Sequence, residues 1–169
     1  MSGARNVKGG LILLSGGLAA GLAMSCYAFQ PMVPVPSALA HYDDLPRRLL
    51  RLAHIAAVML PLINIVVGPW IDRVRLPGHA REAASWLVLL GAITLPCALA
   101  VEAVLPTLMW LHLSAAPAVA FCAGLFVVSV GAYRTTFTTL EAHHAPSERD
   151  GAKDHRDRRR PLQAAPSDV

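Results

Sequence analysis

Long stretches without a charged side chain constrain this chain more than any other feature of its sequence. No Asp, Glu, Lys or Arg occurs in residues 55–71, 83–101 or 104–133, and a further apolar run covers residues 11–29. A helix needs about 20 predominantly apolar residues to cross the hydrocarbon core of a bilayer, which is about 30 Å thick. Each stretch is close to that length. The sequence therefore predicts an integral membrane protein.

The composition agrees with a location in the membrane. Of the 169 residues, 54% are hydrophobic and only 15% are charged, whereas a soluble domain carries about a quarter charged residues. The net charge of +4 would also suit a nucleic-acid-binding protein, but no basic face accompanies a folded reading domain. Basic cytoplasmic segments of a membrane protein give the same charge. We therefore expect the lipid bilayer, and not nucleic acid, as a partner.

Four apolar segments predict four transmembrane helices, at about residues 11–29, 49–70, 83–104 and 107–133. Together they form a transmembrane domain over residues 10–134, in which successive helices run in opposite directions. The predicted fold class is an all-α integral membrane protein with a four-helix transmembrane bundle.

Polar segments flank this domain on both sides. Residues 1–9 are predicted to be a cytoplasmic N-terminus. Residues 135–169 are polar and charged and contain several prolines, so they cannot bury enough apolar surface to fold. We therefore predict that they form a disordered, charged cytoplasmic tail.

The positions of Lys and Arg predict the orientation of the chain, because cytoplasmic loops carry an excess of these residues. With the N-terminus in the cytoplasm, only Arg47, Arg48 and Arg51 lie near the outer ends of the segments. The residues near the cytoplasmic ends are Arg5, Lys8, Arg73, Arg75, Arg81 and Arg134. Both termini are therefore predicted to be cytoplasmic. The abundance of Ala, Arg, Pro and Gly is typical of a GC-rich bacterial gene, which indicates the bacterial inner membrane.

The first apolar segment has an alternative interpretation as a cleaved leader. The residues from Ala23 to Cys26 resemble a lipoprotein cleavage site, which would leave Cys26 as a lipidated N-terminus. The apolar run of residues 11–29 is, however, longer than the roughly 7–15 residues of a signal-peptide core, and Met24 is bulky for its place in such a site. We expect the first helix to be retained.

Small residues that recur every four positions predict close helix packing, because residues four apart share one helix face. Either a compact bundle or homodimerisation through the first helix fits this pattern. Glu102 and His112 continue two of the stripes, so both are expected to face protein rather than lipid. The stripes are Gly17, Gly21 and Ser25; Thr94, Ala98 and Glu102; and His112, Ala116, Ala120 and Gly124.

Three ionisable side chains inside the predicted helices, His54, Glu102 and His112, are candidates for a functional site. Each costs about 2.5–3.5 kcal/mol on membrane-insertion scales, and such residues usually have a function. All three are expected one or two turns inside the outer ends of their helices. A tight hairpin at Pro106 would bring Glu102 and His112 to one level and couple them. Asn64 is expected to form an interhelical hydrogen bond.

This cluster is compatible with several kinds of chemistry. Two histidines and a carboxylate, here His54, His112 and Glu102, could hold a metal ion. His54 and His112 could instead bind a b-type haem from both sides, and a histidine with a carboxylate could act as a proton relay or line a quinone pocket. A purely structural role, with hydrogen bonds to each other or to loop carbonyls, is the remaining alternative.

The sequence contains no recognisable catalytic motif, since the Walker, GxGxxG, HExxH and GxSxG patterns are all absent. Cys26, Cys97 and Cys122 fall inside apolar runs and are expected to be small buried hydrophobes. We therefore expect a non-enzymatic membrane component, or an accessory subunit of a larger membrane complex. The alternative is a haem- or metal-binding redox protein that uses His54 and His112.

Overall fold

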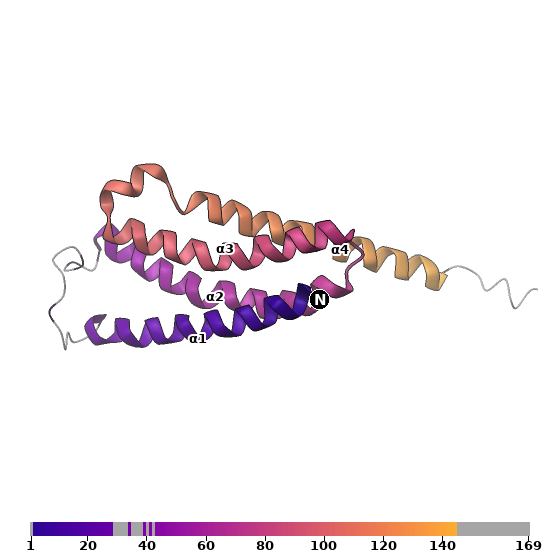
Figure 1. Ribbon diagram of the computed structural model, residues 1–169, viewed down its shortest axis with the longest axis horizontal. Helices are drawn as coiled ribbons and strands as arrows, with labels where there is room; N and C mark the ends of the chain where they lie inside the picture. The colour runs from indigo at the N-terminus through magenta and orange to yellow at the C-terminus, as the bar shows by residue number, and fades with distance from the viewer. Residues whose placement is uncertain (1, 29–33, 35–38, 40, 42, 145–169) are drawn as a thin grey trace, which may run out of the picture. The chain divides into compact units, whose positions relative to one another are not determined.

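The computed structural model describes residues 2–28, 34, 39, 41 and 43–144, and the regular elements in these ranges are all helical (Figure 1). Each α-helix contains a stretch long and apolar enough to cross a membrane. The predicted all-α fold with four membrane-spanning helices is confirmed. The elements are α1 (Ser2–Ala28), α2 (Leu45–Arg73), α3 (Gly78–Val104), the 3-10 helix η2 (Pro106–Leu111) and α4 (Ala115–His144).

Helices α2 and α3 begin four or five residues before their predicted starts, and the other two helices differ more. Helix α1 begins at Ser2 rather than near residue 11, because polar residues of its first turns bond to other helices. Helix α4 begins at Ala115 rather than near residue 107, because residues 106–111 form η2 instead. It continues to His144, and no proline occurs between Pro117 and Pro146 to end it earlier. Ten residues of the predicted tail are thus helical, and residues 145–169 lie outside the described part.

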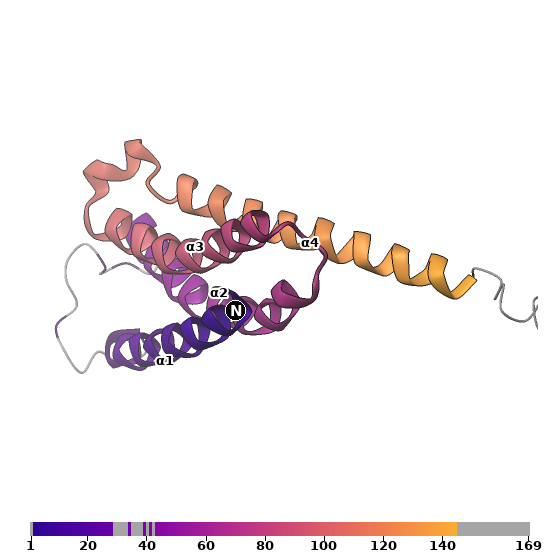
Figure 2. The same cartoon turned by 45° about the vertical axis from the view of Figure 1, so that its right-hand side comes forward.

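Residues up to Thr135 form one compact unit. The start of α1 and the loop between α2 and α3 lie at one end of it (Figure 2), and Thr135 of α4 bonds to that loop. The amide of Gly3 donates to the Asp72 carboxylate at 3.2 Å, and the amide of Arg75 donates to the Thr135 hydroxyl at 3.0 Å. Six Lys and Arg residues, named above as cytoplasmic, lie near this end, which we call the basic end. The opposite end, the η2 end, holds η2 and the start of α2.

Three tryptophans mark the two levels at which this unit would meet the membrane surfaces. Trp70 and Trp86 are both exposed and lie towards the basic end, whereas Trp110 in η2 is 88% exposed at the other end. Tryptophan is enriched at both membrane–water interfaces. Helix α3 rises about 27 Å between Trp86 and Val104 at 1.5 Å per residue, close to the thickness of a hydrocarbon core. The apolar segments therefore match a bilayer in length.

Glycines let α1 and α2 approach at backbone distance. A Cβ atom on Gly17 would collide with the carbonyl of Ala57, and one on Gly10 would lie 2.8 Å from the carbonyl of Pro61. Helices without side chains between them gain van der Waals contact along their whole length, which is the main attraction between helices in lipid. Gly17 therefore packs closely against another helix, as predicted, and that helix is α2 of the same chain.

Helices α3 and α4 pack through a second set of small residues. Gly91 and Gly124 leave room for Phe121 and Val88 on the facing helix, and Val88, Ala92 and Phe121 form a buried cluster. Not all of the predicted α4 stripe is used, since Ala116 is exposed. The three cysteines are exposed, which contradicts the expectation that they are buried: Cys26, Cys97 and Cys122.

Candidate functional site

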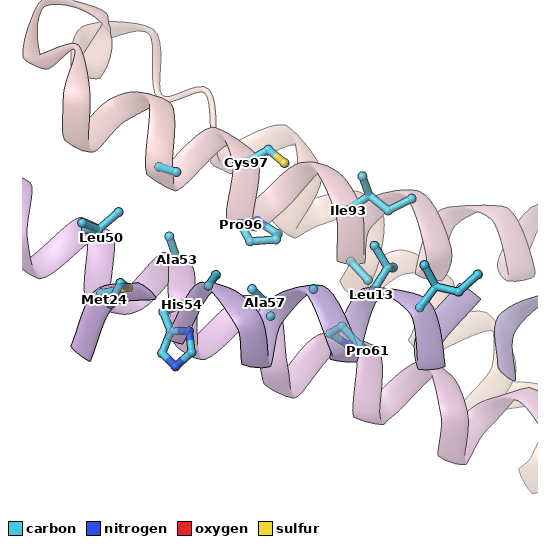
Figure 3. A pocket seen from close by; sticks show the side chains of 16 residues that line it. Leu13, Met24, Leu50, Ala53, His54, Ala57, Pro61, Ile93, Pro96 and Cys97 are labelled. Carbon is cyan, nitrogen blue, oxygen red and sulfur yellow. The ribbon is translucent and has the colours of Figure 1, made fainter. Parts of the chain in front are cut away.

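His54 lies at the interface between α1 and α2. Its imidazole ring fits against Gly21 of α1, where a Cβ atom would lie 2.9 Å from Nε2. The Nδ1 atom is buried and no described residue bonds to it. In Figure 3 the ring points away from Pro96 and Cys97 of α3. The second glycine of the predicted α1 stripe therefore makes space for this histidine.

Glu102 links the end of α3 to the start of α4. Its side chain is only 5% exposed, and it accepts hydrogen bonds from the Ser114 amide at 2.9 Å and the Ser114 hydroxyl at 3.0 Å. Ser114 immediately precedes α4, so the carboxylate lies at the positive end of the α4 dipole. The role is structural, but the partner is not one that the structural alternative named: the donors are the amide and hydroxyl of Ser114, and not another member of the cluster or a loop carbonyl.

His112 lies in the turn between η2 and α4, not on the α4 face where the spacing predicted it. It is exposed and has φ 44°, the left-handed conformation in which histidine is enriched among non-glycine residues. The stripe through Ala116 therefore does not extend back to His112, because α4 has not yet begun there. The expectation that His112 faces protein is wrong for this reason.

The described residues contain no group of three or more His, Cys, Asp or Glu side chains that could hold a metal ion. His54, Glu102 and His112 are thus not gathered into one three-ligand set. Glu102 bonds Ser114, and the groove that His54 lines includes neither Glu102 nor His112. A haem held by His54 and His112 stays a prediction.

His54 lines a groove among α1, α2 and α3, whose volume is about 480 Å³. Many of its lining residues are glycine or alanine, and His54 is the one side chain with a titratable nitrogen among them. Figure 3 shows Leu50 and Met24 at one end of the groove and Leu13 and Pro61 at the other. The small residues that leave this space open are Gly16, Gly17, Ala20, Ala53, Ala57, Ala92 and Ala100.

The groove is elongated along the helices that line it. From Leu50 to Pro61 helix α2 rises about 16 Å, and from Ile12 to Met24 helix α1 rises about 18 Å. This is about half the thickness of a hydrocarbon core, and the half is the one nearer the η2 end. Pro61 and Pro96 line it from α2 and α3. Proline bends a transmembrane helix, so we attribute part of the opening to these two residues.

A buried polar cluster joins three helices on the basic side of the groove. The Asn6 side-chain amide donates to the Asn64 side-chain oxygen at 2.9 Å and to the Ser85 carbonyl at 3.1 Å. Asn64 in turn donates to the Val88 carbonyl at 3.3 Å, and Asn6, Asn64 and Ser85 are fully buried. The interhelical hydrogen bond predicted for Asn64 is confirmed.

An ion pair between α1 and α3 lies beside this cluster, at the basic end. Arg5 of α1 donates to the Glu82 carboxylate at 2.6 Å and to the Ser85 hydroxyl at 2.7 Å. Its guanidinium also lies 4.1 Å from the centre of the Trp86 ring, a cation–π contact. Arg5 therefore ties the start of α1 to α3 in three ways.

These contacts were not predicted from the sequence, because residues 1–9 were assigned to a polar terminus outside the bundle. One signal was available. Asn6 lies four residues before Gly10, on the helix face that Gly10 and Gly17 continue. Extending the predicted helix back by two turns would have placed Asn6 inside the bundle.

Comparison with protein-family models, with curated proteins and with solved structures finds no match for this chain.

Proposed function

We propose that this protein is a non-enzymatic membrane component that holds a molecule with a long apolar chain in the groove among α1, α2 and α3. The groove itself carries this proposal. Its volume of about 480 Å³ falls within the range of about 300–1,000 Å³ that small-molecule sites occupy. Apart from His54, its lining is apolar or sulfur-containing, so it suits a hydrocarbon chain better than water.

The way in which the bundle uses its polar side chains supports a non-enzymatic role. Asn6, Asn64 and Ser85 bond one another across three helices, and Glu102 bonds Ser114. Buried polar groups that are satisfied in this way specify one packing of the helices. In this proposal the bonds among Asn6, Asn64 and Ser85 fix the positions of α1, α2 and α3, whose side chains line the groove.

The proposal includes the setting in which the protein works. The composition supports a bacterial inner membrane, and the distribution of Lys and Arg supports both termini in the cytoplasm, so that the basic end faces inward. An accessory subunit of a larger membrane complex is the role we propose there. Extraction in a mild detergent, followed by a native gel, tests it: migration as a large assembly is expected, and migration as a lone 18.0 kDa chain contradicts it.

Photo-crosslinking tests the binding proposal. A fatty acid with a photoactivatable group in its chain is added to membranes that contain the full-length protein, and crosslinked peptides are mapped. We expect crosslinks in α1, α2 and α3 at groove residues. The variant Gly16→Phe should suppress them, because Gly16 lines the groove and its Cβ position has no neighbour within 4 Å, so a larger side chain can enter without a backbone collision.

The matched control is Ala19→Phe, which places the same ring on an exposed part of α1 outside the groove lining. It should leave the crosslinks unchanged. Equal yields from wild type and Gly16→Phe would refute the proposal. An absorption spectrum of the purified protein separates it from the redox alternative, since a Soret band would indicate haem instead.

A further inference from the structure

On the side of α2 that lines the groove, the next residue towards the η2 end is basic. The groove residues of α2 recur three or four positions apart, from Pro61 through Ala57 and Ala53 to Leu50. The next position in this series is Arg47, three residues before Leu50, and residues three or four apart lie on one helix face. Arg47 therefore lies about one turn beyond Leu50, on the side of α2 that carries the groove residues.

Arg47 is held at this level by the chain around it. Its guanidinium donates to the Leu39 carbonyl at 3.3 Å, and it is only partly exposed. Arg48, the next residue, is different. Its side chain is 60% exposed and lies 3.7 Å from Asp43, and it falls about 100° further round the helix, away from the groove.

We infer that the occupant of the groove is an anionic phospholipid, with one acyl chain between α1, α2 and α3 and its phosphate facing Arg47. This inference rests on the function proposed above and names the ligand of that site. The groove and Arg47 are complementary to such a lipid in the order of their chemical groups. An apolar channel about 16 Å long on α2 leads to a guanidinium, and an anionic phospholipid has the same order of an apolar chain followed by a negative group.

The position of the groove in the bilayer agrees with this occupant. Arg47 lies in the first turn of α2, about 21 Å along the axis from Pro61, at the end where exposed Trp110 marks the interface. Arginine forms strong, often bidentate bonds with phosphate oxygens. A lipid of the leaflet at the η2 end could therefore reach both Arg47 and the groove.

The test compares two photoactivatable lipids that carry the same acyl chain, a phosphatidylglycerol and a phosphatidylcholine. Each is incorporated at low level into phosphatidylcholine vesicles that contain the full-length protein, and the crosslink yield in α1–α3 is measured. Wild type should favour the anionic lipid. Arg47→Gln should lower that preference about fivefold, the effect of about one basic residue at an anionic lipid surface. Arg48→Gln, the matched control, should leave it unchanged.

The outcomes distinguish a failure of the inference about the ligand from a failure of the proposed function. Equal wild-type yields for both lipids would overturn the inference and leave the proposed function standing, because a chain would still occupy the groove. An equal loss of preference in Arg48→Gln would also overturn it, since general surface charge would then be the cause. If Gly16→Phe lowered neither yield, the proposed function would fail, and this inference with it.

Discussion

At the scale of single residues, some polar side chains form contacts that differ from those that their spacing predicts. Glu102 was expected to couple with His112, because a tight hairpin would bring them to one level. In the structure Glu102 instead accepts hydrogen bonds from Ser114, which is two residues after His112. The reason is local: a 3-10 turn and the left-handed conformation at His112 move Ser114, not His112, to the start of α4.

We therefore predict that Glu102→Ala destabilises the protein through Ser114. Removing the carboxylate leaves the Ser114 amide without its acceptor at the start of α4, which should lower the free energy of unfolding by about 1 kcal/mol. A double-mutant cycle measured by unfolding in detergent checks the partner. Glu102→Ala and Ser114→Ala should be coupled, and Glu102→Ala and His112→Ala should be additive. Coupling to His112 instead would contradict the structure.

At the scale of the helices, sequence patterns identified the elements but not their ends or partners. Apolar length alone gave four spans, because the bilayer imposes it. The start of α1 could not be found in this way, since its first turn is stabilised by Arg5 bonding to Glu82 and Ser85, residues far away in the sequence. The groove was also beyond prediction, because it depends on which faces of α1, α2 and α3 meet.

The contact between α1 and α2 gives a prediction at this scale. Gly21→Ala and Gly17→Ala should each destabilise the bundle by about 1–3 kcal/mol, because overpacking forces neighbours apart. Their causes differ, since Gly21 faces the His54 ring whereas Gly17 faces the Ala57 backbone. Adding His54→Ala should reduce the destabilisation caused by Gly21→Ala and leave the destabilisation caused by Gly17→Ala unchanged. Thermal unfolding in detergent measures this, and equal relief of both would show that His54 does not pack there.

At the scale of the whole molecule, alternating helices put six of the Lys and Arg residues at the basic end, and put η2 and the start of α2, with its three arginines, at the other. His41, which is exposed, belongs to the η2 end, and Gly78, whose Cβ position has no neighbour within 4 Å, belongs to the basic end. In a background without the three native cysteines, His41→Cys should react with an impermeant thiol reagent in intact cells. Gly78→Cys should react only after permeabilisation. Labelling of both from outside would exclude an odd number of crossings between them, and with it the predicted orientation.

If the bundle carries a chain-bearing molecule in the α1–α2–α3 groove, native mass spectrometry of the full-length protein, released from a mild detergent, should detect it. Wild type and Ala19→Phe should keep an adduct with the mass of one lipid, and Gly16→Phe should lose it. A wild-type protein without an adduct, or the same adduct on Gly16→Phe, would show that the groove does not hold such a molecule.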